Sequence, residues 1–200
     1  MTIKRFVPLA LCVTVLVCGC GGGEMTLTEY VDGLNAISEW AIPRGEAVAA
    51  EYGQLAEPAL DDLKTMLEGS AALFAETNEA AEALRPPEQV ADLHRLIFDW
   101  QATMIPAAEA LANRAASSTD WDQVLQSAEA DAYAAALAEG SAVCSEFQAK
   151  LDATADRGAF ADTPWIPGEL KEVVEAFLAC GLFPENPEDV FSTPPTTISP

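Results

Sequence analysis

The sequence predicts an all-α protein, organised as a four-helix up-down bundle with two proline-kinked helices and a short fifth helix that caps it. Alanine is abundant from residue 45 to 155 and alternating apolar runs are scarce, which favours helices over strands. Apolar residues also recur at steps of three, four and seven in long stretches separated by short turns. This combination is typical of antiparallel helix packing. We expect the bundle to occupy residues 26–183.

The first helix is predicted to begin at a capping box, Thr26-x-x-Glu29. Its apolar stripe keeps a seven-residue step straight through Pro43, at Leu27, Leu34, Ala41, Val48 and Leu55. Since proline disrupts a helix without always ending it, we expect one long helix that is kinked near Pro43. The dipeptide Glu57-Pro58 then indicates a tight turn.

The second and third helices are separated by Pro86-Pro87. The second is predicted from residue 58 to about residue 84, with apolar positions at Leu60, Leu67, Phe74 and Ala81. The third carries an equivalent row at Val90, Ile97, Met104 and Leu111. It also contains Pro106, at a depth similar to that of Pro43 in the first helix.

A fourth helix is predicted from a second capping-box pattern, Thr119-x-x-Asp122, to about Ala155. After a break at Arg157-Gly158 and a proline-containing stretch at 164–167, a short fifth helix ends at Gly181. Residues 184–200 are rich in proline and threonine, and we expect a disordered tail there.

The chain begins with a basic leader, Lys4-Arg5, and an uncharged run over residues 6–17. A membrane-spanning helix needs about 20 apolar residues, so this run is too short to cross a bilayer. The pattern is typical of an export signal that is removed from the mature chain. An ordinary secretory signal and an uncleaved anchor are both compatible with this leader.

The residues Val17-Cys18-Gly19-Cys20 resemble the lipobox of bacterial lipoproteins. The resemblance implies that residues 1–19 are a signal peptide and that Cys20 receives acyl groups of the palmitate type. Cys18 is the weaker candidate, because bulky Val17 would then precede the cleavage point. The protein would be exported and anchored to the outer face of the cytoplasmic membrane or to the outer membrane. Residues 20–25, with three consecutive glycines, would form a flexible tether.

Two further cysteines, Cys144 and Cys180, would remain in the mature chain. Export delivers a protein to a compartment where disulfides persist, so this pair predicts one bridge. Both residues lie on apolar stripes, and a bridge would hold the fifth helix against the fourth. The alternative is two separate buried thiols.

The charge of the chain excludes one class of partner. The formal net charge is −22, and removal of Lys4 and Arg5 with the signal would leave 8 of the 10 basic residues against 32 acidic ones. Nucleic-acid phosphates would repel such a body. We also expect no metal site and no cofactor, because His94 is the single histidine and no Glu-x-x-His pair, calcium loop or nucleophile motif is present.

Three functions of different classes are compatible with these features. The favoured one is a non-catalytic interaction or scaffold module of the cell envelope, whose partners are the membrane and an envelope protein. The alternative is a small-molecule-binding bundle, with a pocket near the two proline kinks formed by Trp40, Arg44 and Trp100. An enzyme is the least favoured.

Overall fold

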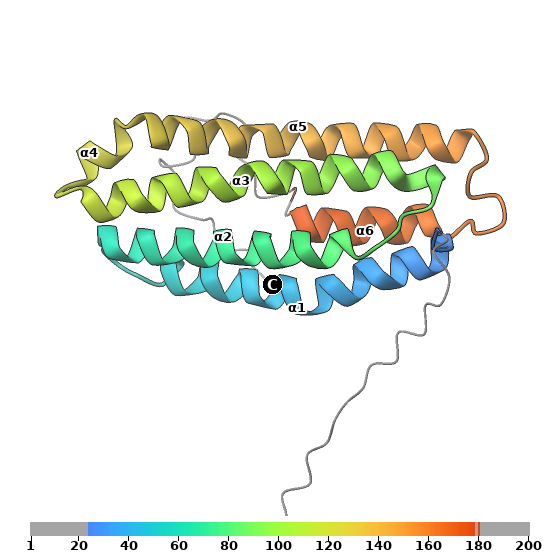
Figure 1. The fold of residues 1–200 in the computed structure, drawn as a ribbon, viewed down its shortest axis with the longest axis horizontal. Helices are drawn as coiled ribbons and strands as arrows, with labels where there is room; N and C mark the ends of the chain where they lie inside the picture. The colour runs from blue at the N-terminus through green and yellow to red at the C-terminus, as the bar shows by residue number, and fades with distance from the viewer. Residues whose placement is uncertain (1–23, 179, 181–200) are drawn as a thin grey trace, which may run out of the picture.

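The computed structural model describes residues 24–178 and 180, and the regular secondary structure of this part is helical (Figure 1). The all-α fold class is therefore confirmed. The predicted signal peptide, Cys20, residues 21–23 and the tail at 184–200 lie outside the described residues. The elements are α1 (Leu27–Gly53), α2 (Leu60–Glu82), the 3-10 helix η1 (Glu88–Val90), α3 (Ala91–Ser117), α4 (Trp121–Leu125), α5 (Ala128–Asp156) and α6 (Ile166–Leu178).

Helix α1 begins at the capping box that the sequence predicted. The Thr26 hydroxyl accepts a hydrogen bond from the backbone N–H of Glu29 at 3.2 Å, and the Glu29 carboxylate accepts one from the Thr26 N–H at 2.8 Å. These bonds satisfy two N–H groups that a helix start leaves without partners. The helix then continues through Pro43 without interruption, as α3 does through Pro106.

The fourth predicted helix is divided in two, which corrects the expectation of one element starting at Thr119. Asp120 is the residue that caps α4, because its carboxylate accepts the Gln123 N–H at 3.0 Å. Ser127 then caps α5 by accepting the Ala130 N–H, and its hydroxyl also donates to the Val124 carbonyl. Serine competes in this way with backbone helix bonds, so it closes one helix and opens the next. At its other end α5 stops before Gly158, which adopts a φ of 80°.

The connections between the long helices lie at two opposite ends of the molecule (Figure 1). One end, here called the entry end, contains residues 24–26, 83–90 and 157–165. The other, the far end, contains residues 54–59 and 118–127. At the entry end the Met25 N–H donates to the Arg85 carbonyl at 3.0 Å, so the start of the body is held against the connection after α2.

Helix α6 lies alongside the long helices (Figure 1) and packs against both α1 and α5. It does not cap an end of the molecule as the sequence analysis expected. Its buried positions are spaced by four residues, at Ile166, Leu170, Val174 and Leu178. This spacing gives α6 one continuous apolar stripe, and burying that stripe on two neighbours requires the helix to run along them. Of the helices in the described region, none is both long and apolar enough to span a bilayer.

The apolar core of the described body consists of two clusters. The first joins α1, α2, α3, α5 and α6 and contains large side chains, among them Tyr30, Phe98 and Phe147. The second joins α2, α3, α4 and α5, and five of its nine buried members are alanines. Small side chains of this kind let helix backbones approach one another closely.

Cys144 and Cys180 form a disulfide with a Cα–Cα distance of 5.9 Å. The bond joins the middle of α5 to the residues that follow α6. It therefore fixes the last described part of the chain to the body, on the side where α6 packs.

We expect the double variant Cys144→Ala/Cys180→Ala to lose stability without losing its helices. The bridge closes a loop with a sequence separation of 36 residues. On the chain-entropy estimate such a loop contributes about 4 kcal/mol, or roughly 10 °C in melting temperature for a body of this size. Urea unfolding of both forms measures the difference. Ser145→Ala, one residue from Cys144 on the exposed face of α5, is the control, and an equal loss in that variant would contradict the assignment.

Candidate functional site

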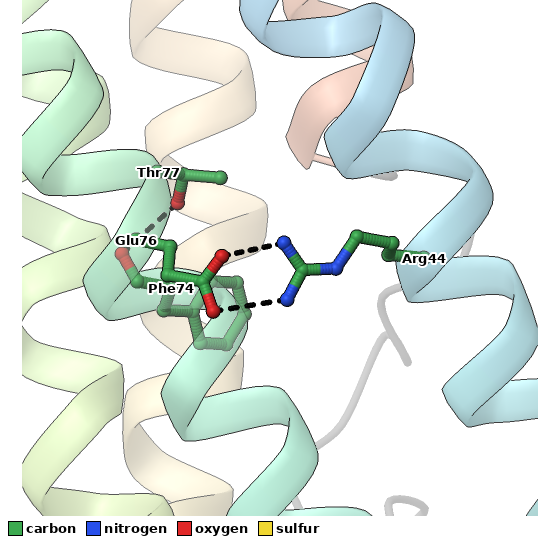
Figure 2. Close-up of polar contacts among 4 residues, drawn as sticks. All are labelled: Arg44, Phe74, Glu76 and Thr77. Atoms are coloured by element: carbon green, nitrogen blue, oxygen red, sulfur yellow. Dashed lines mark hydrogen bonds and ion pairs between the residues drawn. The ribbon is translucent and has the colours of Figure 1, made fainter. Parts of the chain in front are cut away.

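The predicted pocket residue Arg44 is engaged in an interhelical ion pair. Its guanidinium contacts the Glu76 carboxylate on α2 through two parallel N–H···O bonds of 2.5 and 2.9 Å (Figure 2). Hydrogen bonding to Arg44 lowers the pKa of the Glu76 carboxyl, and the same bond raises the pKa of Arg44. The fork-shaped donor of arginine fits a carboxylate in this geometry. Both side chains are about half exposed, so the pair forms a clip between α1 and α2 on the surface.

The two tryptophans of the predicted pocket have different surroundings. Trp40 is partly buried, and the Arg44 guanidinium carbon lies 5.3 Å from the centre of its ring, within range of a cation–π contact. Trp100 is 6% exposed in the first core cluster. Its indole N–H donates to the Ala136 carbonyl on α5 at 2.9 Å, and its ring packs edge-on against Phe74 of α2. The structure thus brings Trp40 and Arg44 together and places Trp100 in the core.

Two surface hollows lie away from these three residues. One runs between α2 and α3 and is lined by Glu68, Ala71, Ala75, Glu109 and Ala112, among others. The other lies at the entry end, where Glu88 and Asp92 line the hollow together with Lys150 of α5 and Arg157, the residue after α5. Trp40, Arg44 and Trp100 line neither hollow. Alanines and two glutamates line the first hollow, and the second carries charges of both signs.

His94 lies within an aromatic group where α1, α3 and α6 meet. Its Nδ1 hydrogen-bonds with the Tyr30 hydroxyl at 3.1 Å, and its ring centre is 4.7 Å from that of Phe98. Phe98 in turn packs edge-on against Phe177 of α6. Burial lowers the pKa of His94, and the negative charge of Asp99 opposes that shift without overcoming it. The neutral imidazole is therefore favoured, and it serves as a packed side chain with one hydrogen bond.

A buried polar pair lies between α2 and α3. The Thr77 hydroxyl is 3.3 Å from the Gln101 side-chain oxygen. It also donates to the carbonyl of Phe74 at 2.9 Å, the bond that Figure 2 shows. Both polar residues are almost fully buried. Such pairs fix the register of two helices, because a shifted register would leave a buried polar group without a partner.

Sequence reasoning missed the partners of these residues. Neither the Arg44–Glu76 ion pair nor the Tyr30–His94 hydrogen bond was predicted from the sequence. Nothing in the spacing of one helix reveals which residue of another helix it meets. Trp165 is exposed just before α6. Its exposure could have been suspected from the stretch Pro164-Trp-Ile-Pro167, in which a large aromatic residue lies between two prolines.

We expect the stability of the protein to fall in mildly acidic solution through His94. The folded-state pKa lies below the unfolded value of about 6.5, so between those two values the unfolded chain binds more protons. The contribution of neutral His94 is complete above pH ~6.5 and is lost as the pH falls toward the folded-state pKa. The free energy of unfolding in urea, measured for wild type and His94→Gln from pH ~8 to ~5, should converge or cross as the pH falls. Parallel curves would refute the assignment.

Comparison with known proteins finds no match for this chain among family models, curated proteins or solved structures. The function must therefore be inferred from the residues of the chain itself.

Proposed function

We propose that this protein is an exported, lipid-anchored module of the cell envelope that acts by binding other components rather than by catalysis. Cys20 would carry the lipid, and the acidic helical body would stand outside the cytoplasmic membrane. The observation that carries the proposal is the lipobox-like sequence Val17-Cys18-Gly19-Cys20, followed after a few residues by a folded body.

The distance between the lipid site and the body supports an anchor. Residues 21–23 are glycines, and Met25 is already hydrogen-bonded to Arg85. A few residues, three of them glycines, separate the two, and glycine-rich sequences are suited to join a lipid to a folded domain. Diacyl and amide-linked chains together hold a protein stably, whereas one acyl chain alone gives marginal binding.

The disulfide supports a location of the protein outside the cytosol. Cys144 and Cys180 are bonded in the structure, and disulfides persist mainly outside the cytosol. Cysteines that serve as redox or metal centres usually occur in closely spaced pairs, and these two are 36 residues apart in the sequence. A structural bridge in an exported protein fits this spacing.

The contacts of the polar side chains support binding over catalysis. His94 is packed with Tyr30 and Phe98, and Gln101 is paired with Thr77 inside the core. A catalytic base must reach a substrate proton, and the His94 ring is already engaged within the body by the Tyr30 hydroxyl and the Phe98 ring. The small-molecule pocket stays a prediction, and two of its three residues are already engaged with Glu76 and Ala136.

We further propose that the long helices α1, α2, α3 and α5 form an up-down bundle, bent at Pro43 and Pro106. The packing of α1 on α2, α2 on α3 and α3 on α5 supports this arrangement, as do connections that alternate between the entry and far ends. A proline inside a helix removes one N–H donor and crowds the carbonyl four residues earlier. A bend at each proline is the expected consequence.

The anchor is tested by producing the full chain in a bacterium that processes lipoproteins, in the presence of labelled palmitate. We expect the wild type to incorporate label and to stay in the membrane fraction through a high-salt wash. Cys20→Ala should lose both properties. Cys18→Ala is the matched control and should keep both. Label that persists in Cys20→Ala, or that disappears in Cys18→Ala, would assign the lipid elsewhere.

The binding role is tested by crosslinking the anchored protein in intact cells and identifying the captured proteins by mass spectrometry. We expect a specific partner to be captured by the wild type and lost with Cys20→Ala, because the released body leaves the membrane surface. Identical capture by both forms would contradict a role that depends on anchoring.

A further inference from the structure

We infer that the entry end of the body rests on the lipid surface, with the Trp165 ring in the headgroup region and Arg85 and Arg157 beside lipid phosphates. This inference rests on the proposed anchor at Cys20. It adds the orientation of the body and the residues that touch lipid. The molecule would stand on its entry end, with the far end pointing away from the membrane.

The length of the tether limits which part of the body can reach lipid. Glu24, the first described residue, follows Cys20 by four positions, and four residues span at most about 14 Å when fully extended. Met25 is held by two contacts with Arg85: its N–H donates to the Arg85 carbonyl at 3.0 Å, and its sulfur accepts the Arg85 N–H at 3.3 Å. The connection after α2 is therefore kept within about the same reach of the bilayer.

Trp165 is presented on a firmly built connection at that end. Its side chain is 47% exposed, whereas its neighbour Ile166 is fully buried. The connection 157–165 is fixed by successive backbone hydrogen bonds, including Thr163 N–H to the Phe160 carbonyl at 3.0 Å, and Phe160 itself is buried in the core. The Trp165 carbonyl also accepts the Glu169 N–H at the start of α6. A large exposed indole on a rigid support suits the membrane interface, where the ring meets acyl chains and the N–H meets water.

The two ends of this acidic body differ in charge. The connections of the far end carry Glu57, Asp120 and Asp122, and among the described residues the one basic side chain bonded to them is Arg114 of α3, which donates to the Gln123 carbonyl. Those of the entry end carry three acidic residues as well, but also Arg85 and Arg157, both exposed. Lipid phosphates repel the far end and are met by two guanidinium groups at the entry end.

The opposite orientation conflicts with the dimensions of the body. Leu55 and Leu125, each 40% exposed, lie at the far end. A helix of 27 residues such as α3 is about 40 Å long, so those side chains are far beyond the reach of the tether in an upright molecule. They would meet lipid only if the body lay flat, and that would press the acidic flanks of the helices against the phosphates.

The inference is tested with the acylated full chain in vesicles of phosphatidylethanolamine and phosphatidylglycerol, with and without brominated lipid, which quenches nearby tryptophan. The protein has 4 tryptophans, so contact by one of them should remove about a quarter of the emission. We expect this loss in the wild type and its disappearance in Trp165→Phe. Trp121→Phe, in α4 at the far end, is the matched control and should keep the loss.

The outcomes separate this inference from the proposed anchor, because the mass of the same preparation reports acylation of Cys20. Acylated protein that is quenched equally in wild type and Trp165→Phe overturns the orientation and leaves the anchor standing. Quenching lost in Trp121→Phe also overturns it, because the far end would then be at the lipid. Unmodified Cys20 overturns both.

Arg85→Glu/Arg157→Glu should weaken the quenching in these anionic vesicles, and Arg114→Glu, at the far end, should not. Equal effects of the two changes would overturn the role of the two arginines.

Discussion

The fold depends on the apolar stripe of α6, which fills the space between α1 and α5. The helices α1, α2, α3 and α5 pack on one another in that order, so α1 and α5 are the first and last of the row. Helix α6 packs against both of them. The four buried side chains from Ile166 to Leu178 join the first core cluster, which includes the buried aromatic residues of the described region. Removing α6 would expose that cluster to water, and burial of apolar surface is the main stabilising contribution in a domain of this size. The disulfide after α6 keeps the stripe in place.

The sequence predicted the elements better than their partners. The three- and four-residue steps of apolar side chains predicted long helices, and the Thr26 capping box set the start of α1, because both signals are local. Asp120 and Ser127 divided the fourth helix because each side chain bonds to nearby backbone groups, a choice that the apolar pattern does not reveal.

The candidate site shows the same limit. The sequence predicts a pocket near Pro43 and Pro106 because the two prolines lie at similar depths in their helices. In the structure, the side chains predicted to form this pocket have other partners. The Trp100 side chain lies in the core, where its N–H donates to the Ala136 carbonyl. The Arg44 side chain lies on the surface and pairs with Glu76. Which residue of one helix meets which of another depends on the rotation and register of both, and one sequence read helix by helix contains no measure of either.

If the entry end lies at the lipid, as proposed, the two ends of the acidic body would experience different electrostatic surroundings. Screening in physiological salt extends over about 8 Å, whereas α3 alone is about 40 Å long. In the proposed orientation, the charge of the membrane would act on the entry end and would not reach the far end. There, Leu55 and Leu125 are exposed on connections whose charged residues are all acidic. In that orientation a partner approaching from outside would meet the far end first, and a surface combining apolar and basic side chains would complement it.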